Sequence, residues 1–260
     1  MAKVSVIVTT YNRKEYLTET INSILNQTFS DFELIVIDNF SEYDFFELIG
    51  SFNDKRIRGF QNANNGVIAT NRNIGIKNAR YEYLAFCDDD DLWMSNKLEK
   101  QVLFIENNNL ETKNILLYTN CIEFSETMFR TTRKNEISTI NDLLIDNQVS
   151  LSSVLISRDE LNYFFNENIE YIAVEDYLLW CTLKIKGYEF YLLKDALIKY
   201  RILNNSMSKA NYGMSHLRII IAKMFILINN KNLKINYTRL CVNIMLNISK
   251  FWIKKSSKLF

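Results

Sequence analysis

The chain has 260 residues, of which 48% are hydrophobic and 23% are charged, as in a folded protein with one large domain or one domain and an appendage. Its four cysteines are scattered without a C-x-x-C pair, which argues against a zinc site or a disulfide framework and suits a reducing cytoplasm. The first residues contain no basic stretch followed by a longer apolar core, so we expect no signal peptide.

The formal net charge of +1 hides an uneven distribution of charge along the chain. Residues 201–260 hold 11 Lys and Arg residues and no acidic residue, whereas residues 1–200 hold 20 basic and 30 acidic residues. A basic C-terminal segment of this kind indicates contact with an anionic surface.

Strands and helices are expected to alternate along the first 107 residues. Residues 4–10, VSVIVTT, form a continuous β-branched run that predicts a buried parallel strand. Residues 14–27 place Leu17, Ile21 and Ile24 on one face of a helix. The pattern continues with predicted strands at 32–38, 56–62 and 81–87 and predicted helices at 43–51, 67–79 and 95–107.

This alternation predicts a parallel sheet with helical crossovers, in which ligands bind beyond the carboxyl ends of the strands. Three polar stretches follow predicted strands: TTYN after the first, DNFS after the second and CDDDD after the fourth. We therefore expect these stretches to meet at one edge of the sheet.

The second half of the chain has a mixed pattern. Its predicted elements are strands at 115–124 and 149–157, a polar loop at 131–136 between them, a helix from 174 to about 187, a strand up to 193, and helices at 209–231 and 236–255. Glu175 and Asp176 fall at the N-terminus of the first helix, where the dipole favours negative charge.

Four consecutive carboxylates, Asp88 to Asp91, directly follow a strand-like apolar run. They repel one another unless a positive charge lies among them, and four acids exceed what helix capping requires. A hard cation such as Mg²⁺ or Mn²⁺ takes oxygen ligands, usually one or two carboxylates together with substrate phosphates. Because alternate residues of an extended segment point the same way, Asp88 and Asp90 are expected to face one ligand, with Asp89 or Asp91 turned elsewhere.

Five stretches, taken in chain order, carry a resemblance to a known family. They are VSVIVTTYNRKEYLTETINSILNQTFSDFELIVID, NNGVIATNRNIGIKNA, FCDDDDLW with its D-x-D pattern, VEDYLLW, and YRILNNSMS. Together they resemble the inverting glycosyltransferases of family 2 over roughly residues 3–205. The resemblance implies an α/β GT-A fold, with a Rossmann-like, mainly parallel sheet flanked by helices, in residues 1–205. Residues 206–260 would form a basic amphipathic helical extension.

The resemblance also implies how a nucleotide would be bound. Thr9 and Tyr11 would line the nucleobase and ribose, and Asp38 would accept hydrogen bonds from the base or sugar. Arg72 would approach the diphosphate or the base. Asp88 would contribute contacts to the nucleotide sugar as well as to a metal ion.

The catalytic groups implied by the resemblance are carboxylates. Asp88 and Asp90 would hold Mn²⁺ or Mg²⁺, which would assist departure of a diphosphate as a Lewis acid. Asp176 would be the general base that takes the proton of the acceptor hydroxyl, and Glu175 would orient the acceptor or the base. Direct displacement from one face inverts the anomeric centre, so an α-linked donor would give a β-linked product.

The expected reaction moves a hexose from a UDP-sugar to a hydroxyl of a growing bacterial surface glycan, such as an O-antigen or capsule unit on a polyprenyl diphosphate lipid. This acceptor rests on the resemblance and on the basic tail. We expect a cytoplasmic protein bound peripherally at the inner face of the cell membrane.

The sequence departs from the family pattern at three places. Asp38 is followed by Asn39 where two acids are usual, which leaves the base preference open. The glycine usual after the third helix is replaced around Arg80 and Tyr81. No histidine follows the late YR pair, and the single histidine, His216, is expected to be a surface or core residue.

Two interpretations of the basic tail stay open. In one, a helical pair packs on the catalytic domain with a basic solvated face. In the other, which the resemblance favours, an amphipathic surface rests on anionic lipid. No apolar run reaches the roughly 18 to 20 residues that span a bilayer. The helical stripes are Leu217, Ile220, Ile221, Met224, Phe225 and Ile228, and Leu240, Cys241, Ile244, Met245, Ile248 and Trp252.

Other functions are less compatible with the sequence. A nucleotidyltransferase usually needs a glycine-rich phosphate loop near the first strand, and TTYNRKEY has no glycine. A non-catalytic nucleotide-sugar-binding module would not need Asp88, Asp90 and Asp176 together. The tail is too apolar for a nucleic-acid-binding arm, so no nucleic-acid partner is expected.

Overall fold

The computed structural model describes residues 2–158, 164–203 and 212–256. Its strands are β1 (Val4–Thr10), β2 (Phe32–Asp38), β3 (Ile57–Gln61), β4 (Tyr83–Asp88), β5 (Leu92–Trp93), β6 (Ile115–Phe124), β7 (Phe129–Thr132), β8 (Leu155–Ser157) and β9 (Glu189–Arg201). Its α-helices are α1 (Lys14–Leu25), α2 (Phe45–Ser51), α3 (Ile68–Asn78), α4 (Lys97–Asn107), α5 (Ile140–Ile145), α6 (Glu175–Ile185), α8 (Tyr212–Asn229) and α9 (Tyr237–Ser256).

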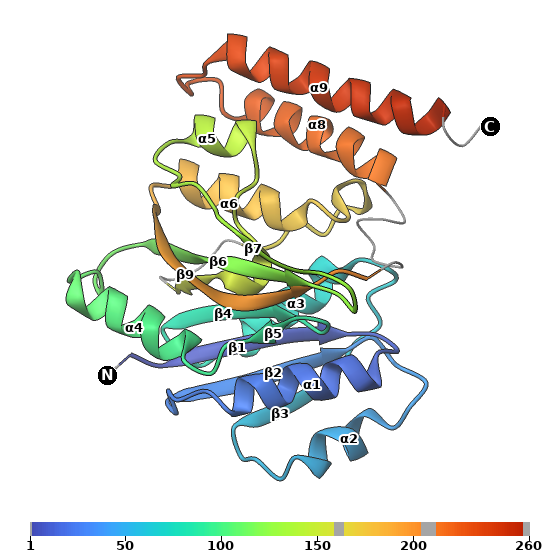
Figure 1. Ribbon diagram of the computed structural model, residues 1–260, viewed down its shortest axis with the longest axis vertical. Helices are drawn as coiled ribbons and strands as arrows, with labels where there is room; N and C mark the ends of the chain where they lie inside the picture. The colour runs from blue at the N-terminus through green and yellow to red at the C-terminus, as the bar shows by residue number, and fades with distance from the viewer. Residues whose placement is uncertain (1, 159–163, 204–211, 257–260) are drawn as a thin grey trace.

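The strands form one sheet in the order β3-β2-β1-β4-β8-β6-β9-β5, and β7 pairs with β6 outside this path (Figure 1). The first four strands are mutually parallel, and so are β6 and β9. The pairings of β5, β7 and β8 are antiparallel. The predicted mainly parallel sheet is confirmed, and the antiparallel strands lie in its second half.

Each strand of the parallel half faces two separate apolar cores. In β1, Val4, Val6 and Val8 contribute to the core that α1 and α4 cover, whereas Ile7 contributes to the core on the other face, with α3 and α6. Successive side chains of a strand point to opposite faces, so a strand covered on both sides needs an unbroken apolar run. This explains the VSVIVTT pattern.

Helix α3 packs very close to the sheet because Gly75 has no side chain. A Cβ atom at Gly75 would lie 2.4 Å from Ile7 Cγ2 and 3.1 Å from Ile37 Cδ1. The close approach brings the first turns of α3, including Arg72, to the carboxyl edge of β1 and β4.

The sequence prediction was wrong between residues 129 and 157. The predicted strand 149–157 is a 3₁₀ turn at Leu151–Ser153 followed by the short strand β8, and the predicted polar loop 131–136 begins inside β7. The Ser153 hydroxyl donates to the Ser150 carbonyl at 2.7 Å, a local bond that competes with strand pairing. The short elements α5 and β5 were not predicted.

The two C-terminal helices pack on the α/β part of the chain, at the top of Figure 1. Ala222 and Ile226 of α8 and Leu240 of α9 belong to the same apolar core as Trp180 of α6. The division at residue 205 lies outside the described residues and stays a prediction, as does the structure of residues 204–208 in the YRILNNSMS stretch.

The predicted stripe on α8 only partly matches the buried face. Ile220 is buried, but Met224, Phe225 and Ile228 are exposed, while Ala222 and Lys223 point inward. The Lys223 ammonium donates to Asn243 of α9, so a buried polar contact helps to join the two helices. Apolar side chains on α8 therefore cover two faces, one packed and one open. The side chain of Trp252 lies outside the described part of α9.

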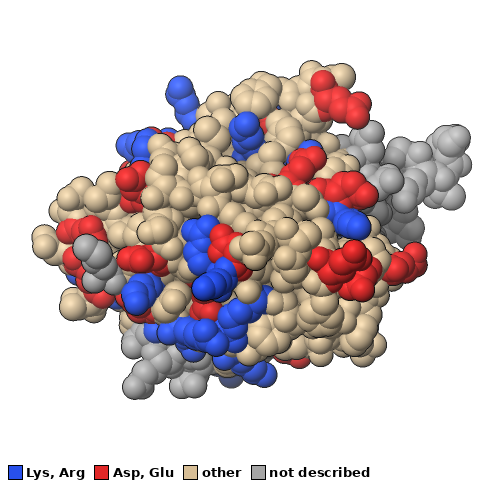
Figure 2. All heavy atoms as spheres, turned by 90° about the horizontal axis from the view of Figure 1, so that it is seen from below, with Lys and Arg blue, Asp and Glu red and all other residues tan. Residues whose placement is uncertain are grey.

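Strand β3 forms an edge of the sheet, and this edge is charged. Arg56 pairs with Asp54 at 2.7 Å, and Arg58 pairs with Glu33 at 2.8 Å. Figure 2, which views the molecule from this end, shows Lys and Arg side chains gathered together with acidic side chains among them. Charged side chains of this kind discourage an edge strand from pairing with another chain.

The close packing of α3 gives a stability prediction. Gly75→Ala should lower the free energy of unfolding by roughly 1–3 kcal/mol, because the new methyl group would overlap Ile7. Gly50→Ala is the matched control, since nothing lies within 4 Å of a Cβ atom there, and alanine should be neutral or stabilise α2 by up to about 1 kcal/mol. Urea denaturation measures both variants, and equal stability of the two would contradict the packing described.

Candidate functional site

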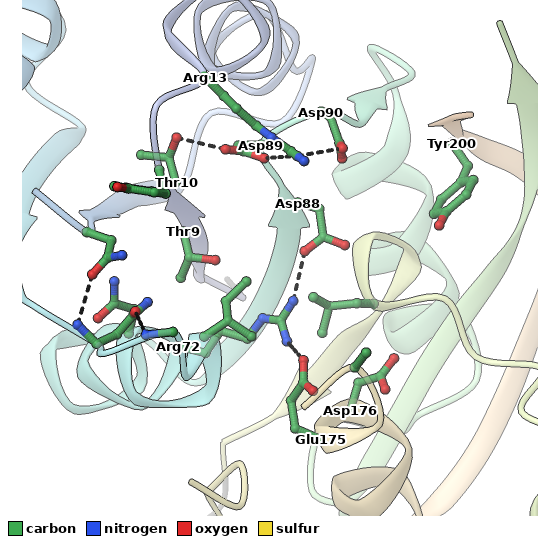
Figure 3. A pocket seen from close by; sticks show the side chains of 18 residues that line it. Thr9, Thr10, Arg13, Arg72, Asp88, Asp89, Asp90, Glu175, Asp176 and Tyr200 are labelled. Atoms are coloured by element: carbon green, nitrogen blue, oxygen red, sulfur yellow. Dashed lines mark hydrogen bonds and ion pairs between the residues drawn. The ribbon is translucent and has the colours of Figure 1, made fainter. Parts of the chain in front are cut away.

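A cavity of about 460 Å³ opens at the carboxyl ends of β1 and β4 (Figure 3). It brings together the polar stretches that follow these strands, the start of α3 and the start of α6. Of the residues predicted for the site, those that line it are Thr9, Tyr11, Arg72, Asp88, Asp90, Glu175 and Asp176.

The turn after β1 is held in place from the neighbouring loop. Asn12 adopts a positive φ of 52°, which asparagine tolerates better than most residues. Its backbone N–H donates to the Ser41 hydroxyl at 2.7 Å, and its side-chain oxygen accepts from the Glu42 N–H at 2.7 Å. These bonds fix the turn that presents Tyr11, whose side chain is 53% exposed.

The acidic turn after β4 is held by groups from three elements. The Thr20 hydroxyl of α1 contacts the carbonyls of Asp89 and Asp91 at 2.9 and 2.8 Å. The buried Asp91 carboxylate accepts from the Ser152 hydroxyl at 2.6 Å and from the Arg201 N–H at 3.0 Å. Asp91 therefore holds the turn together and does not line the cavity.

Two arginines lie among the remaining acids. Arg13 Nη1 lies 3.0 Å from Asp89 Oδ1 and 2.8 Å from Asp90 Oδ2. Arg72 Nη2 lies 2.9 Å from Asp88 Oδ1, and its Nη1 lies 2.6 Å from Glu175 Oε1. The positive charge that the run of aspartates requires is thus partly supplied by the chain itself.

Helix α6 delivers the pair Glu175 and Asp176 to the far side of the cavity. The preceding Ala173 has φ = 67°, a left-handed conformation that costs a non-glycine residue on the order of 1 kcal/mol and that redirects the chain into the helix. Glu175 is engaged by Arg72, whereas the Asp176 carboxylate accepts from the N–H of Tyr177 at 2.6 Å. Asp176 is therefore the less encumbered carboxylate for proton transfer.

Burial of the site shifts its acids toward neutrality. Burial, and after it the Glu175 carboxylate, raise the pKa of Asp176 against the opposing effect of Arg72, to about 7 in total. Burial also raises the pKa of Asp89 to about 7, against the effect of Arg13. A carboxylate with a pKa near neutrality can both accept and release a proton at physiological pH.

Arg72 keeps its charge despite being buried. Burial alone would lower its pKa, but the carboxylates of Asp88, Glu175 and Asp176 together raise the pKa above its ordinary value. The guanidinium also lies 5.4 Å from the centroid of the Phe165 ring. Arg72 is thus a fixed positive charge at the cavity wall.

Asp38 lies outside the cavity lining. Its carboxylate is fully buried and accepts hydrogen bonds from Ser41 and from the Gln61 amide. The neighbouring Asn39 lines the cavity instead. A direct role of Asp38 in nucleotide binding stays a prediction, and in this structure its carboxylate orders the loop after β2.

Sequence reasoning missed several residues of the site. Arg13 directly follows the predicted polar stretch TTYN, and a lone arginine after a strand carried no distinctive signal. Ser152 was hidden inside a segment predicted as a strand, and Tyr200 approaches the site only because β9 runs beside β6. Trp93 and Trp180, whose rings are of a kind that stacks on sugars, are both buried in the core and do not line this cavity.

The residues present suit a divalent cation held jointly with a ligand. In the described part of the chain, no three or more His, Cys, Asp or Glu side chains are grouped to hold a metal ion alone. Asp88 and Asp90 present side chains that are 33% and 16% exposed at the cavity. Two carboxylates completed by phosphate oxygens form a donor set that Mg²⁺ and Mn²⁺ commonly take.

Comparison with known sequences gives a consistent family. The family model of Glycosyl transferase family 2 matches residues 5–144. The UDP-Glc:alpha-D-GlcNAc-diphosphoundecaprenol beta-1,3-glucosyltransferase WfgD of Escherichia coli is 30% identical over 213 residues, covering 80% of this chain and 81% of that protein. An uncharacterized glycosyltransferase of Rickettsia bellii is 50% identical over 109 residues, but these cover 42% of this chain and only 16% of that longer protein.

Comparison with solved structures concerns the fold alone, because the identities are low. S. aureus TarS 1-349 in complex with UDP-GlcNAc matches with a TM-score of 0.73 and 20% identity, over 95% of this chain and 72% of that one. Mannosyltransferase PcManGT from Pyrobaculum calidifontis, in complex with GDP-Man and Mn²⁺, matches with a TM-score of 0.67 and 15% identity, over 96% and 72%.

The mainly parallel sheet and its flanking helices agree with these structural matches. The family match extends over more than half of the residues, and WfgD is matched along most of its length. The chain therefore belongs to glycosyl transferase family 2 and is a glycosyltransferase with the GT-A fold.

Proposed function

We propose that the protein transfers a hexose from a UDP-sugar to a hydroxyl of a lipid-linked glycan acceptor, with inversion and with help from Mn²⁺ or Mg²⁺. The observation that carries this proposal is the convergence of Asp88, Asp90, Arg72 and Asp176 on one cavity. A donor diphosphate needs positive charge, and an acceptor hydroxyl needs a base, and both kinds of group line the same cavity.

The donor would bind at the ends of β1 and β4. Thr9 and Tyr11 line the side of the cavity that the β1 turn forms, where a nucleoside would be placed. Arg72 would approach the diphosphate, because its charge is fixed near Asp88. Asp88 and Asp90 would hold the cation, which when bound stabilises negative charge on the departing diphosphate.

The acceptor would enter beside α6. Asp176 would take the proton of its hydroxyl as the oxygen attacks the anomeric carbon, and the bond from that carbon to the UDP oxygen would break. Glu175 would position Arg72 and, through it, Asp88. Because the hydroxyl would attack from the face opposite UDP, the anomeric centre would invert, and an α-linked donor would give a β-linked product.

A UDP-hexose donor and a polyprenyl-diphosphate-linked acceptor are favoured by the name of WfgD, which states both for that protein. We extend them to this chain as its substrates, within the synthesis of a bacterial surface polysaccharide such as an O-antigen or capsule. Divalent-cation use is supported by the paired carboxylates and by the Mn²⁺ named in the PcManGT complex.

The tail would hold the enzyme at the inner face of the membrane that carries such a lipid. No helix among the described residues is long and apolar enough to span a bilayer. Helix α9 exposes Val242, Met245 and Leu246, which share a helical face, and residues 201–260 carry no acidic side chain. Exposed apolar side chains beside a purely basic charge suit an anionic lipid surface.

The assignment of Asp176 as base is tested by Asp176→Asn. Transfer from UDP-glucose to an acceptor glycolipid should fall by at least about 10²-fold, because general base catalysis is lost. Binding of UDP, measured by calorimetry, should stay within about twofold of wild type, since the amide keeps the size of the side chain. Unchanged turnover would contradict the assignment of Asp176 as base. So would a fall in turnover that is accompanied by loss of UDP binding.

The raised pKa of Asp176 also predicts the pH dependence. The base must be ionised, so kcat/KM should rise with pH through about 7 and level off above it. The folded state binds a proton at Asp176 more tightly than the unfolded chain, so stability from this group is lost as pH rises through about 7. Asp176→Asn should therefore raise Tm relative to wild type at pH 8, and the gain should shrink toward pH 4.

Membrane binding is tested by Met245→Asp, which places a charge on a side chain that is 68% exposed on α9. Co-sedimentation with phosphatidylglycerol vesicles should weaken by roughly tenfold, because an apolar contact with lipid is replaced by a charge. Phe129→Asp on β7, also 68% exposed, is the control and should bind as wild type does. Equal binding of the two variants would contradict a lipid-binding surface on α9. So would wild-type binding to phosphatidylcholine vesicles that is as strong as its binding to phosphatidylglycerol vesicles.

A further inference from the structure

Arg13 contacts two aspartates that differ in their surroundings. Its Nη1 reaches both Asp89 and Asp90, and the side chain is 31% exposed at the cavity. Asp89 is buried and its other oxygen accepts from the Thr10 hydroxyl at 2.8 Å. Both aspartates line the cavity, but the Asp90 side chain is the more exposed, 16% against 8% for Asp89, and a cation would be held at Asp90.

From this asymmetry we infer that Arg13 competes with the divalent cation for Asp90, with Asp89 anchoring Arg13 in both states. A guanidinium and a dication that touch the same carboxylate repel each other at short range. When the cation takes Asp90, Arg13 loses one of its two partners and keeps the buried one. The inference rests on the proposed function only in expecting a cation at Asp88 and Asp90.

This arrangement explains why the chain places a buried carboxylate next to a metal ligand. Without Asp89, Arg13 would have no partner when Asp90 turned to the cation, and its charge would lie uncompensated at the cavity wall. It also implies weak binding of the cation alone. A donor diphosphate supplies further oxygen ligands and negative charge, so cation and donor should bind together.

The competition is measured by titrating Mn²⁺ alone into the full chain and following free Mn²⁺ by electron paramagnetic resonance. Arg13→Gln should bind Mn²⁺ about tenfold more tightly than wild type, because Asp90 becomes available. Lys14→Gln is the charge-matched control: Lys14 is exposed, and its ammonium lies 5.9 Å from the Tyr43 ring centroid. That variant should change the affinity by less than about twofold.

A double variant separates a direct effect at Asp90 from general electrostatics. In an Asp90→Asn background, Arg13→Gln should no longer tighten Mn²⁺ binding. The competition would be overturned if Arg13→Gln showed no gain in Mn²⁺ affinity, or only the same gain as Lys14→Gln. It would also be overturned if the gain persisted without the Asp90 carboxylate. If circular dichroism shows that Arg13→Gln is unfolded, Arg13→Lys is tested in its place. Its gain in Mn²⁺ affinity should be larger than that of Lys14→Gln and smaller than that expected for Arg13→Gln.

The outcome is independent of whether the sugar-transfer proposal holds. Wild-type transfer from UDP-glucose is measured separately, with and without a chelator. If the wild type transfers glucose but Arg13→Gln does not bind Mn²⁺ more tightly, only the competition for Asp90 is contradicted. Tightening through Asp90 without transfer would support the competition and remove the proposed reaction.

Discussion

Five carboxylates and two arginines share the wall of one cavity, and the balance between their charges shapes the rest of the site. Arg72 of α3 joins Asp88, the last residue of β4, to Glu175 of α6. Arg13, directly before α1, pairs with Asp89 and Asp90 in the turn after β4. An excess of negative charge remains after this pairing. Burial is the main cause of the raised pKa of Asp89 and of Asp176, and neighbouring carboxylates raise both values further against the effect of the arginines. A cation bound with an anionic diphosphate would relieve that excess, so the charges of the site suit both.

The parallel half of the fold and its functional edge could be predicted from the sequence. Buried strands with helices between them leave a pattern of unbroken apolar runs and amphipathic segments, and the polar stretches after β1 and β4 did meet at one cavity. The placement of Glu175 and Asp176 at the start of α6 was also predicted correctly. These features follow from local periodicity and from a topological rule, and neither depends on distant contacts.

The parts that could not be predicted depend on contacts between distant segments. The Ser152 hydroxyl, in the 3₁₀ turn, donates to the Asp91 carboxylate, 61 residues earlier, and no local sequence pattern predicts that contact. Asp38 follows a strand as expected, yet its carboxylate turns into the loop toward Ser41 and Gln61. On α8 the apolar residues cover both a packed and an open face, so the two interpretations of the tail, packing and lipid contact, are compatible with one structure.

In the proposed reaction a cation would bridge the acidic turn to a donor diphosphate, and this bridge would connect the paired carboxylates to sugar transfer. Calorimetric titration of UDP-glucose into the wild-type protein, once with Mn²⁺ and once with a chelator, tests it most directly. UDP-glucose should bind at least about tenfold more tightly with Mn²⁺, because two carboxylates without a cation repel the diphosphate. Equal affinity under the two conditions would contradict it.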